Sequence, residues 1–190
     1  MDTNELTKVI YEAAVVKRVK RTGWQILGGH EESVGEHTFM TCVIAFFLGK
    51  QLGADLLQVL TMSIFHDFHE ARTGEVDKLA KFYITRDQDR ANHDIFAAID
   101  GELLQLLDCY EAKQTLEAKI VYEANVVAFL VEVKILAERG HTQAKEWFDG
   151  NFTRLKLPET HALAQSLWDT DSQIWWKQFR DILNENFLHE

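Results

Sequence analysis

The sequence predicts an all-α protein that forms a single-domain bundle of about six or seven helices. Apolar residues recur at helical spacing along nearly the whole chain, and no alternating strand pattern of useful length occurs. Proline occurs once and glycine ten times in 190 residues, so few residues interrupt helices. We expect residues 1–190 to form one domain, with a core at about 17–139 and C-terminal helices at 141–190 packed on it.

In the N-terminal half, the expected helices have recognisable boundaries. The expected elements are a helix around Leu6–Val16, a glycine-containing loop at Thr22–Gly35, a helix from Ser33 to about Gln51, and a helix from about Asp55 to Glu70. Ser33 and Glu36 have the spacing of a capping box, which predicts a helix start. Because this helix is nearly all apolar after Phe39, we expect it to be central.

In the C-terminal half, the expected helices are longer. The expected elements are a helix at about Gln88–Leu107, one at about Ala112–Arg139, a short element around Trp147, and a last helix that begins at Pro158. Gly140 is expected to end the second of these helices, and Pro158 suits the first turn of a helix. Residues 77–87 have an ambiguous pattern.

The composition excludes several classes of protein. Twenty basic and thirty acidic residues give a net charge of −10, which argues against extended nucleic acid as a partner. A small anionic ligand remains compatible, because one pocket can be positive on an acidic protein. Cys42 and Cys109 have no CxxC partner, and the longest apolar run, Val43–Leu48, is too short for a membrane span. The first ten residues lack the apolar core of a signal peptide, so we expect a soluble, cytoplasmic protein.

A metal site is one interpretation of the adjacent pair His66 and Asp67, which lies near the end of an apolar helix. Neighbouring side chains diverge by ~100° on a helix, so a shared ion must lie near a helix end or between helices. His37, in the first turn of the preceding helix, supplies a second imidazole. Such ligands suit a divalent metal. The alternative is that His66 caps its helix and Asp67 is solvated.

Other residues near this pair can take part in catalysis. Glu70 is on the same helix face as His66 and Asp67, where a carboxylate can accept a proton from water. Glu75 adds a second carboxylate. The N-terminal region supplies cations and a flat apolar side chain, which are Lys17, Arg18, Lys20, Arg21 and Trp24. The alternatives are a solvated helix end for Glu70, an exposed basic face, and a tryptophan in the core.

Three segments resemble the HD-domain metal-dependent phosphohydrolases. They are Lys20–Trp24 (KRTGW), Glu32–His37 (ESVGEH) and His66–Glu75 (HDFHEARTGE). The closest branch contains the bacterial 5′-deoxynucleotidases and related eukaryotic HD-domain-containing nucleotidases. With a fourth block at Glu123–Asn125 (EAN), the similarity covers about residues 17–139. These blocks indicate the superfamily and the branch, and they do not identify the substrate.

The resemblance implies roles for matched positions and an HD-domain fold. The implied metal ligands are His37, His66, Asp67 and Asn125, the implied catalytic residues Glu70 and Glu75, and the implied substrate-binding residues Arg21 and Trp24. Glu70 would orient or deprotonate the attacking water, Arg21 would contact phosphate, and Trp24 would pack against the sugar. Glu75 stands where the branch usually has Asp. The implied cofactor is one divalent ion, which is Mn, Co, Zn, Fe or Mg.

Asn125 departs from the family pattern, because the fourth ligand in the family is an Asp. An amide carbonyl can coordinate a cation but brings no charge. Three interpretations follow. Asn125 is a neutral ligand of a weaker site, Glu123 replaces it although it lies ~200° away around the helix, or the site has lost metal and activity.

Two functional hypotheses follow from this sequence. The first is a metal-dependent phosphohydrolase that removes phosphate from a small nucleotide, such as a (deoxy)nucleoside 5′-monophosphate. The second is a catalytically silent HD-fold protein that binds a nucleotide or a protein partner. Under either hypothesis the resemblance implies a homodimer, and no membrane association is expected.

Overall fold

The computed structural model describes residues 2–187, apart from the side chains at positions 178, 186 and 187. Over this range the chain is all-α, as predicted, and contains no strand apart from an isolated bridge between Lys20 and Ser33. The α-helices are α1 (Thr3–Val16), α2 (Gly23–Leu27), α3 (Val34–Leu52), α4 (Leu56–Phe65), α5 (Glu70–Thr73), α6 (Gln88–Phe96), α7 (Gly101–Ala112), α8 (Leu116–Glu138), α9 (Ala144–Phe152), α10 (Pro158–Asp169) and α11 (Ile174–Phe187). A 3₁₀ helix at Ala80–Phe82 lies between α5 and α6.

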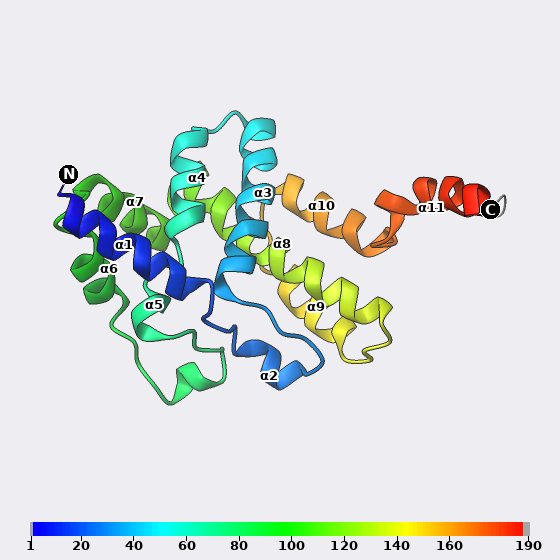
Figure 1. Cartoon of the computed structure of the whole chain (residues 1–190), viewed down its shortest axis with the longest axis horizontal. Coiled ribbons are helices and arrows are strands. Elements are labelled where there is room, and N and C mark those ends of the chain that lie inside the picture. Colours follow the sequence, from blue (N-terminus) through cyan, green and yellow to red (C-terminus); the bar gives the residue numbers. More distant parts are fainter. Residues whose placement is uncertain (1, 188–190) are drawn as a thin grey trace.

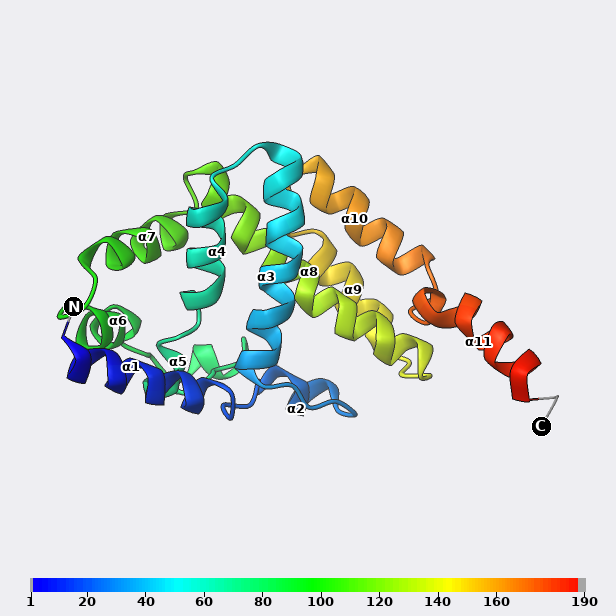
Figure 2. The same ribbon diagram turned by 45° about the horizontal axis from the view of Figure 1, so that its top comes forward.

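Helix α8 is the centre of the fold. Five helices, α3, α4, α7, α9 and α10, pack against it (Figures 1 and 2). Its side chains are buried on nearly all sides, which is expected of an apolar helix enclosed by neighbours. The expectation that the helix after Ser33 is central is also met, since α3 packs against α4 and along α8.

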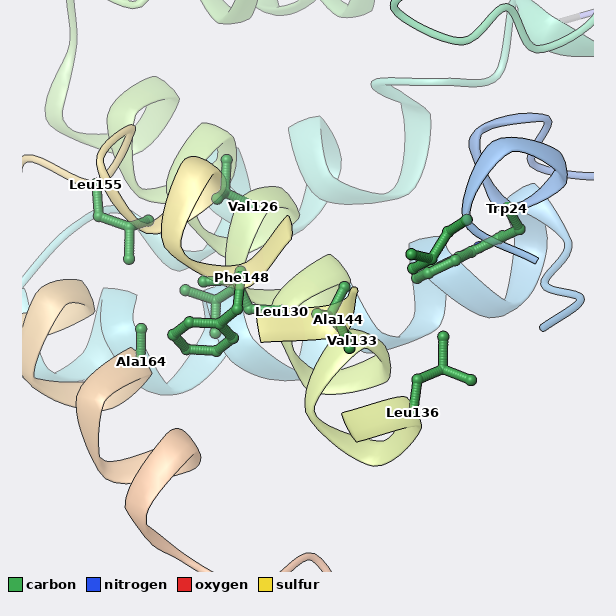
Figure 3. Packing of buried hydrophobic residues seen from close by; sticks show 11 residues of the cluster. Trp24, Val126, Leu130, Val133, Leu136, Ala144, Phe148, Leu155 and Ala164 are labelled. Carbon is green, nitrogen blue, oxygen red and sulfur yellow. The ribbon is translucent and has the colours of Figure 1, made fainter. Parts of the chain in front are cut away.

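The largest cluster of buried apolar side chains joins the N- and C-terminal parts of the domain. Trp24, Leu130 and Phe148 belong to it, although they come from α2, α8 and α9 (Figure 3). The indole of Trp24 stacks on the ring of Phe129, with 4.9 Å between ring centroids. This packing fixes α2 beside α8, and so places the segment Arg21–Trp24 next to the helices that carry the predicted ligands.

Local sequence signals locate several helix ends correctly. Both hydrogen bonds of the capping box between Ser33 and Glu36 are present at the start of α3. Gly140 has a φ of 91° just after α8, a conformation that L side chains rarely adopt. Pro158 is in the first turn of α10, where its missing N–H costs no hydrogen bond.

The helix predicted at about Gln88–Leu107 is two helices, α6 and α7. The Asp100 side chain accepts hydrogen bonds from the backbone N–H groups of Glu102 and Leu103, and this cap starts α7. The next predicted helix begins later than expected, because Lys113 takes a left-handed conformation and Thr115 caps α8. In both cases a local cap interrupts an apolar pattern that continues through it.

The remaining differences add short helices to the six or seven predicted. Thr22–Gly35 is not entirely a loop, because α2 lies within it. The helix predicted from about Asp55 to Glu70 ends at Phe65, and four residues in turns precede α5. The short element around Trp147 is α9. The break after Phe65 matters most, because it falls at the predicted metal ligands.

The C-terminal segment has two parts that differ in packing. Helices α9 and α10 pack against α8, whereas α11 extends away from the other helices in both views (Figures 1 and 2). Trp168 contacts the ring of Phe148, while Trp175 on α11 is 73% exposed. Within residues 2–187, no helix is both long and apolar enough to cross a bilayer.

Candidate metal centre

The end of α4 brings the adjacent side chains of His66 and Asp67 together. The backbone leaves the helix after Phe65 and continues in turns to α5. Nε2 of His66 lies 3.1 Å from Oδ2 of Asp67. In a continuous helix these neighbours would diverge, so the turn is what allows both to face one point.

His37 reaches the same point from the first turn of α3. Its side chain is fully buried, and its ring centroid lies 6.1 Å from that of His66. Ligand atoms of His37, His66 and Asp67 all lie within 4.8 Å of one another. Across residues 2–187, these three form the one group of at least three His, Cys, Asp or Glu side chains that converges closely enough for a metal.

Asn125 approaches this group from α8. Its carbonyl oxygen Oδ1 lies 3.0 Å from Nε2 of His37. Its amide Nδ2 donates a hydrogen bond to the hydroxyl of Tyr110, at 3.2 Å. The structure therefore brings all four residues implied as ligands, from α3, the turn after α4, and α8, to one location.

Glu123 does not take the place of the missing aspartate, so that alternative is wrong. Its carboxylate accepts hydrogen bonds from the backbone N–H groups of Lys156 and Leu157 and from the Thr160 hydroxyl. These contacts hold the start of α10, on another side of α8. The angular separation of Glu123 and Asn125 around the helix accounts for the difference.

The arrangement of lone pairs fits a bound cation. His66 donates its Nδ1–H to the carbonyl of Ser63 at 2.8 Å, so that in the neutral ring Nε2 carries the lone pair. That lone pair faces Asp67, which is also an acceptor, and Nε2 has no hydrogen-bond partner. A cation held by both Nε2 of His66 and Oδ2 of Asp67, which lie 3.1 Å apart, would remove the repulsion between these two acceptors.

Charges around the centre set the protonation states of its ligands. Burial opposes the charge of Asp67, but His66, His37 and Arg21 hold the pKa of Asp67 below its ordinary value. Burial and the charge of Arg21 lower the pKa of His37, which favours the neutral ring. Asp67 raises the pKa of His66 against the effect of burial, and a cation between the two would replace that proton.

Glu70 lies beside the centre as the first residue of α5. It is 4% exposed, and its Oε2 has no hydrogen-bond partner. Burial and the charge of Asp67 raise the pKa of Glu70 to about 8. A carboxyl group with this pKa can bind or release a proton near neutral pH, which suits acid–base chemistry.

Arg86 is a residue of this site that sequence reasoning missed. Its Nη1 donates hydrogen bonds to Oε1 of Glu70 and to the carbonyl of Gly74, each at 2.8 Å. The guanidinium is only 14% exposed and holds Glu70 in place. Arg86 lies within residues 77–87, whose pattern was ambiguous, and no motif in the sequence marks it.

Glu32 was also missed as a functional residue, although it begins the ESVGEH segment. Its Oε2 accepts a hydrogen bond from Nε1 of Trp24 at 2.9 Å and lies 3.4 Å from Nε of Arg21. Its Oε1 is 3.5 Å from Nδ1 of His37. Burial opposes its charge, but His37 and Arg21 keep the pKa of Glu32 low. Glu32 thus connects a metal-ligand candidate to both predicted substrate residues.

The predicted substrate-binding residues, Arg21 and Trp24, both contact Glu32 at the edge of the centre. Arg21 is 17% exposed and pairs with Glu32. Trp24 is 3% exposed, with Phe129 on one face and the ring of His30 against it at 4.7 Å. In this structure Trp24 contacts the site through its Nε1 atom and Glu32.

Glu75, the second predicted catalytic residue, holds two chain segments together. Its carboxylate accepts hydrogen bonds from the backbone N–H of Thr22, at 2.6 Å, and from the Thr22 hydroxyl. The Thr22 hydroxyl also accepts from the N–H of Asp77. The charge of Glu75 contributes to the raised pKa of Glu70, so the two carboxylates are electrostatically linked.

A hollow of about 750 Å³ is lined in part by Glu32. Its other lining residues include Lys17, Lys20, His30 and Glu132. Glu32 lines it, but His37, His66 and Asp67 do not. The hollow is therefore adjacent to the centre and separate from it.

Comparisons with known proteins identify the family. The family model for the HD domain matches residues 13–168, and the chain belongs to the HD-domain family. No curated protein is significantly similar to the chain.

Solved structures share the fold. PH0347 from Pyrococcus horikoshii OT3 is 24% identical with a TM-score of 0.73, and the match covers 86% of this chain and 98% of that one. A protein described as a predicted metal-dependent phosphohydrolase from Magnetospirillum magnetotacticum MS-1 is 18% identical with a TM-score of 0.66, covering 87% and 90%. The HD phosphohydrolase DatZ of cyanophage S-2L, solved with dA and one catalytic Zn²⁺, is 18% identical with a TM-score of 0.54, covering 84% and 96%.

Proposed function

We propose that the protein is a metal-dependent phosphohydrolase that removes phosphate from a small nucleotide of the nucleoside 5′-monophosphate class. The observation that carries this proposal is the convergence of His37, His66 and Asp67 on one point, with the carbonyl of Asn125 beside them. Glu70 adds a buried acid–base group next to that point. Membership of the HD-domain family is consistent with this chemistry.

In the proposed reaction, water attacks phosphorus, the bond between phosphorus and the nucleoside oxygen breaks, and that oxygen receives a proton. A divalent ion would act as a Lewis acid on the phosphate and lower the pKa of the attacking water. Glu70 binds and releases the proton that passes from the attacking water to the nucleoside oxygen, since its pKa of about 8 lies close to neutral pH. Arg86 holds the Glu70 carboxylate in place. Arg21 supplies positive charge to offset that of phosphate.

Two features support a nucleotide as the substrate. The KRTGW, ESVGEH and HDFHEARTGE segments resemble the nucleotidase branch, and Glu32 links the first two of these segments in space. DatZ, which shares the fold, was solved with dA and one zinc ion. The homodimer and the cytoplasmic location stay predictions.

The second candidate function is a catalytically silent protein that binds a nucleotide or a protein partner. Asn125 favours it, because the amide brings no negative charge to the centre. The amide also finds partners without an ion, since it contacts both His37 and Tyr110. The two functions differ in whether the protein as purified holds a metal and turns over substrate.

Metal content and phosphate release together test the proposal. The protein is purified without chelator, analysed for bound metal, and assayed against deoxyribo- and ribonucleoside 5′-monophosphates with Mn²⁺, Co²⁺, Zn²⁺, Fe²⁺ or Mg²⁺. We expect chelator-sensitive phosphate release, which His66→Asn abolishes. His93→Asn is the matched control, because that side chain is 72% exposed and outside the centre. Metal-independent release, or no release with every ion, contradicts the enzyme.

A further inference from the structure

The two ends of the Asn125 side chain are chemically different, unlike those of the aspartate that the family has there. Oδ1 has lone pairs that can bind a cation, whereas Nδ2 carries only hydrogen-bond donors. Only one orientation of the amide therefore serves a metal. The other orientation would direct N–H groups at the ion, so the metal-binding orientation needs an acceptor for the buried Nδ2.

Tyr110 is placed to accept the hydrogen bond that Nδ2 must make when Oδ1 faces the ion. The amide Nδ2 of Asn125 donates to the Tyr110 hydroxyl at 3.2 Å, while Oδ1 faces Nε2 of His37 at 3.0 Å. A backbone or carboxylate oxygen could also accept from Nδ2, but the hydroxyl of Tyr110 is the acceptor found for it within residues 2–187. The phenol thus satisfies the nitrogen end and leaves the oxygen end toward the centre.

The Tyr110 ring is itself held firmly. It lies in the last turn of α7, is 6% exposed, and packs in one buried cluster with Val121 and Ala124 of α8. Its ring also contacts His66 edge-on, with 5.6 Å between centroids. A side chain fixed by packing on two helices can impose an orientation on its hydrogen-bond partner.

We propose that Tyr110 is a positioning residue of the metal centre, which holds the Asn125 amide with its carbonyl oxygen directed to the ion. This inference rests on the proposed metal centre. Without the hydroxyl, the orientation that serves the ion leaves a buried N–H without an acceptor, and that loss opposes metal binding. An aspartate at position 125 would not need Tyr110, because both of its oxygens can face the ion.

A double-mutant cycle tests the inference by metal affinity alone. Zn²⁺ and Mn²⁺ are titrated by calorimetry into metal-free wild type, Tyr110→Phe, Asn125→Asp and the double variant. We expect Tyr110→Phe to weaken binding roughly tenfold or more in the Asn125 protein, the size found for groups that orient metal ligands. In the Asn125→Asp protein we expect the same change to have an effect of less than about threefold, because the carboxylate has no N–H to satisfy.

Tyr122→Phe is the matched control. It removes another phenol hydroxyl, which accepts hydrogen bonds from Arg154 rather than from a residue of the centre. We expect its metal affinity to equal that of wild type, and a thermal melt of each metal-free variant checks the fold. Equal metal affinities for Tyr110→Phe and wild type, or an equal loss in both backgrounds, would overturn the role of Tyr110. If wild type itself binds neither ion, the metal centre fails and the inference fails with it.

A measurement on the wild type keeps the test valid if Tyr110→Phe does not fold. In the zinc-loaded protein, we expect nuclear Overhauser effects between the Asn125 amide hydrogens and the Tyr110 ring hydrogens next to the hydroxyl. Amide hydrogens that lie instead against the ring of His37 would show the opposite orientation and overturn the inference.

Discussion

Oδ1 of Asn125 lies 3.0 Å from Nε2 of His37, although 88 residues separate the two in the chain. The contact joins α8 to the first turn of α3, beside His66 and Asp67. The amide therefore occupies the place that the resemblance assigns to a carboxylate. The proposed fourth ligand of this chain therefore differs in charge from the aspartate of the family pattern.

Restoring the carboxylate should strengthen metal binding. Asn and Asp are nearly the same size, so Asn125→Asp adds a charge with little change in packing. We expect metal affinity to rise roughly tenfold or more, since added anionic ligands offset the charge of the cation. Asn92→Asp is the control, because Asn92 is also buried but is on α6, which packs against α5 and α7. A less stable Asn125→Asp protein that binds metal no better would remove Asn125 from the centre.

Glu70 should be needed for turnover but not for metal binding. We expect Glu70→Gln to keep the metal and to lower kcat by about 10²–10⁴-fold, the usual contribution of an acid–base group. His69→Gln is the comparison, because His69 is also buried and adjacent, and its loss should cost much less. Equal losses at the two positions would show that the assignment of Glu70 is wrong.

The raised pKa of Glu70 should appear in the stability of the metal-free protein. Because the folded protein binds this proton more tightly than the unfolded chain does, stability contributed by Glu70 is lost as pH rises from about 4.5 to about 8. The slope is at most about 1.4 kcal/mol per pH unit for one proton. Urea unfolding of wild type and Glu70→Gln across this range isolates the contribution. The two stabilities should converge toward low pH and differ most near pH 8, with the variant gaining relative to wild type.

Glu32 should matter for both stability and metal affinity. Glu32→Gln leaves the half-buried Arg21 without its carboxylate and removes the negative charge 3.5 Å from Nδ1 of His37. We expect a loss of about 1–3 kcal/mol in unfolding free energy and a metal affinity lowered roughly tenfold. The neighbouring Glu31 is 82% exposed, so Glu31→Gln should change neither quantity. An unchanged metal affinity in Glu32→Gln would limit Glu32 to a structural role.

The agreement between sequence and structure is closest where a feature depends on neighbouring residues. The capping box at Ser33, the glycine after α8 and the proline at the start of α10 act within one or two turns, so the sequence alone locates them. Apolar spacing predicted the all-α class for the same reason. The breaks at Asp100 and Lys113 were missed, because the apolar pattern continues across them.

The residues of the candidate site also fall into those that the sequence marked and those that only the structure revealed. Residue types and spacing in the sequence marked His37, His66, Asp67 and Glu70, and the family resemblance added Asn125. Only the tertiary structure decided which oxygen of α8 faces the centre, excluded Glu123, and brought in Arg86, Glu32 and Tyr110. The physical reason is that these contacts join residues from different segments of the fold, such as Arg86 with Glu70 and Tyr110 with Asn125. The direction of a side chain between packed segments is not encoded in local spacing.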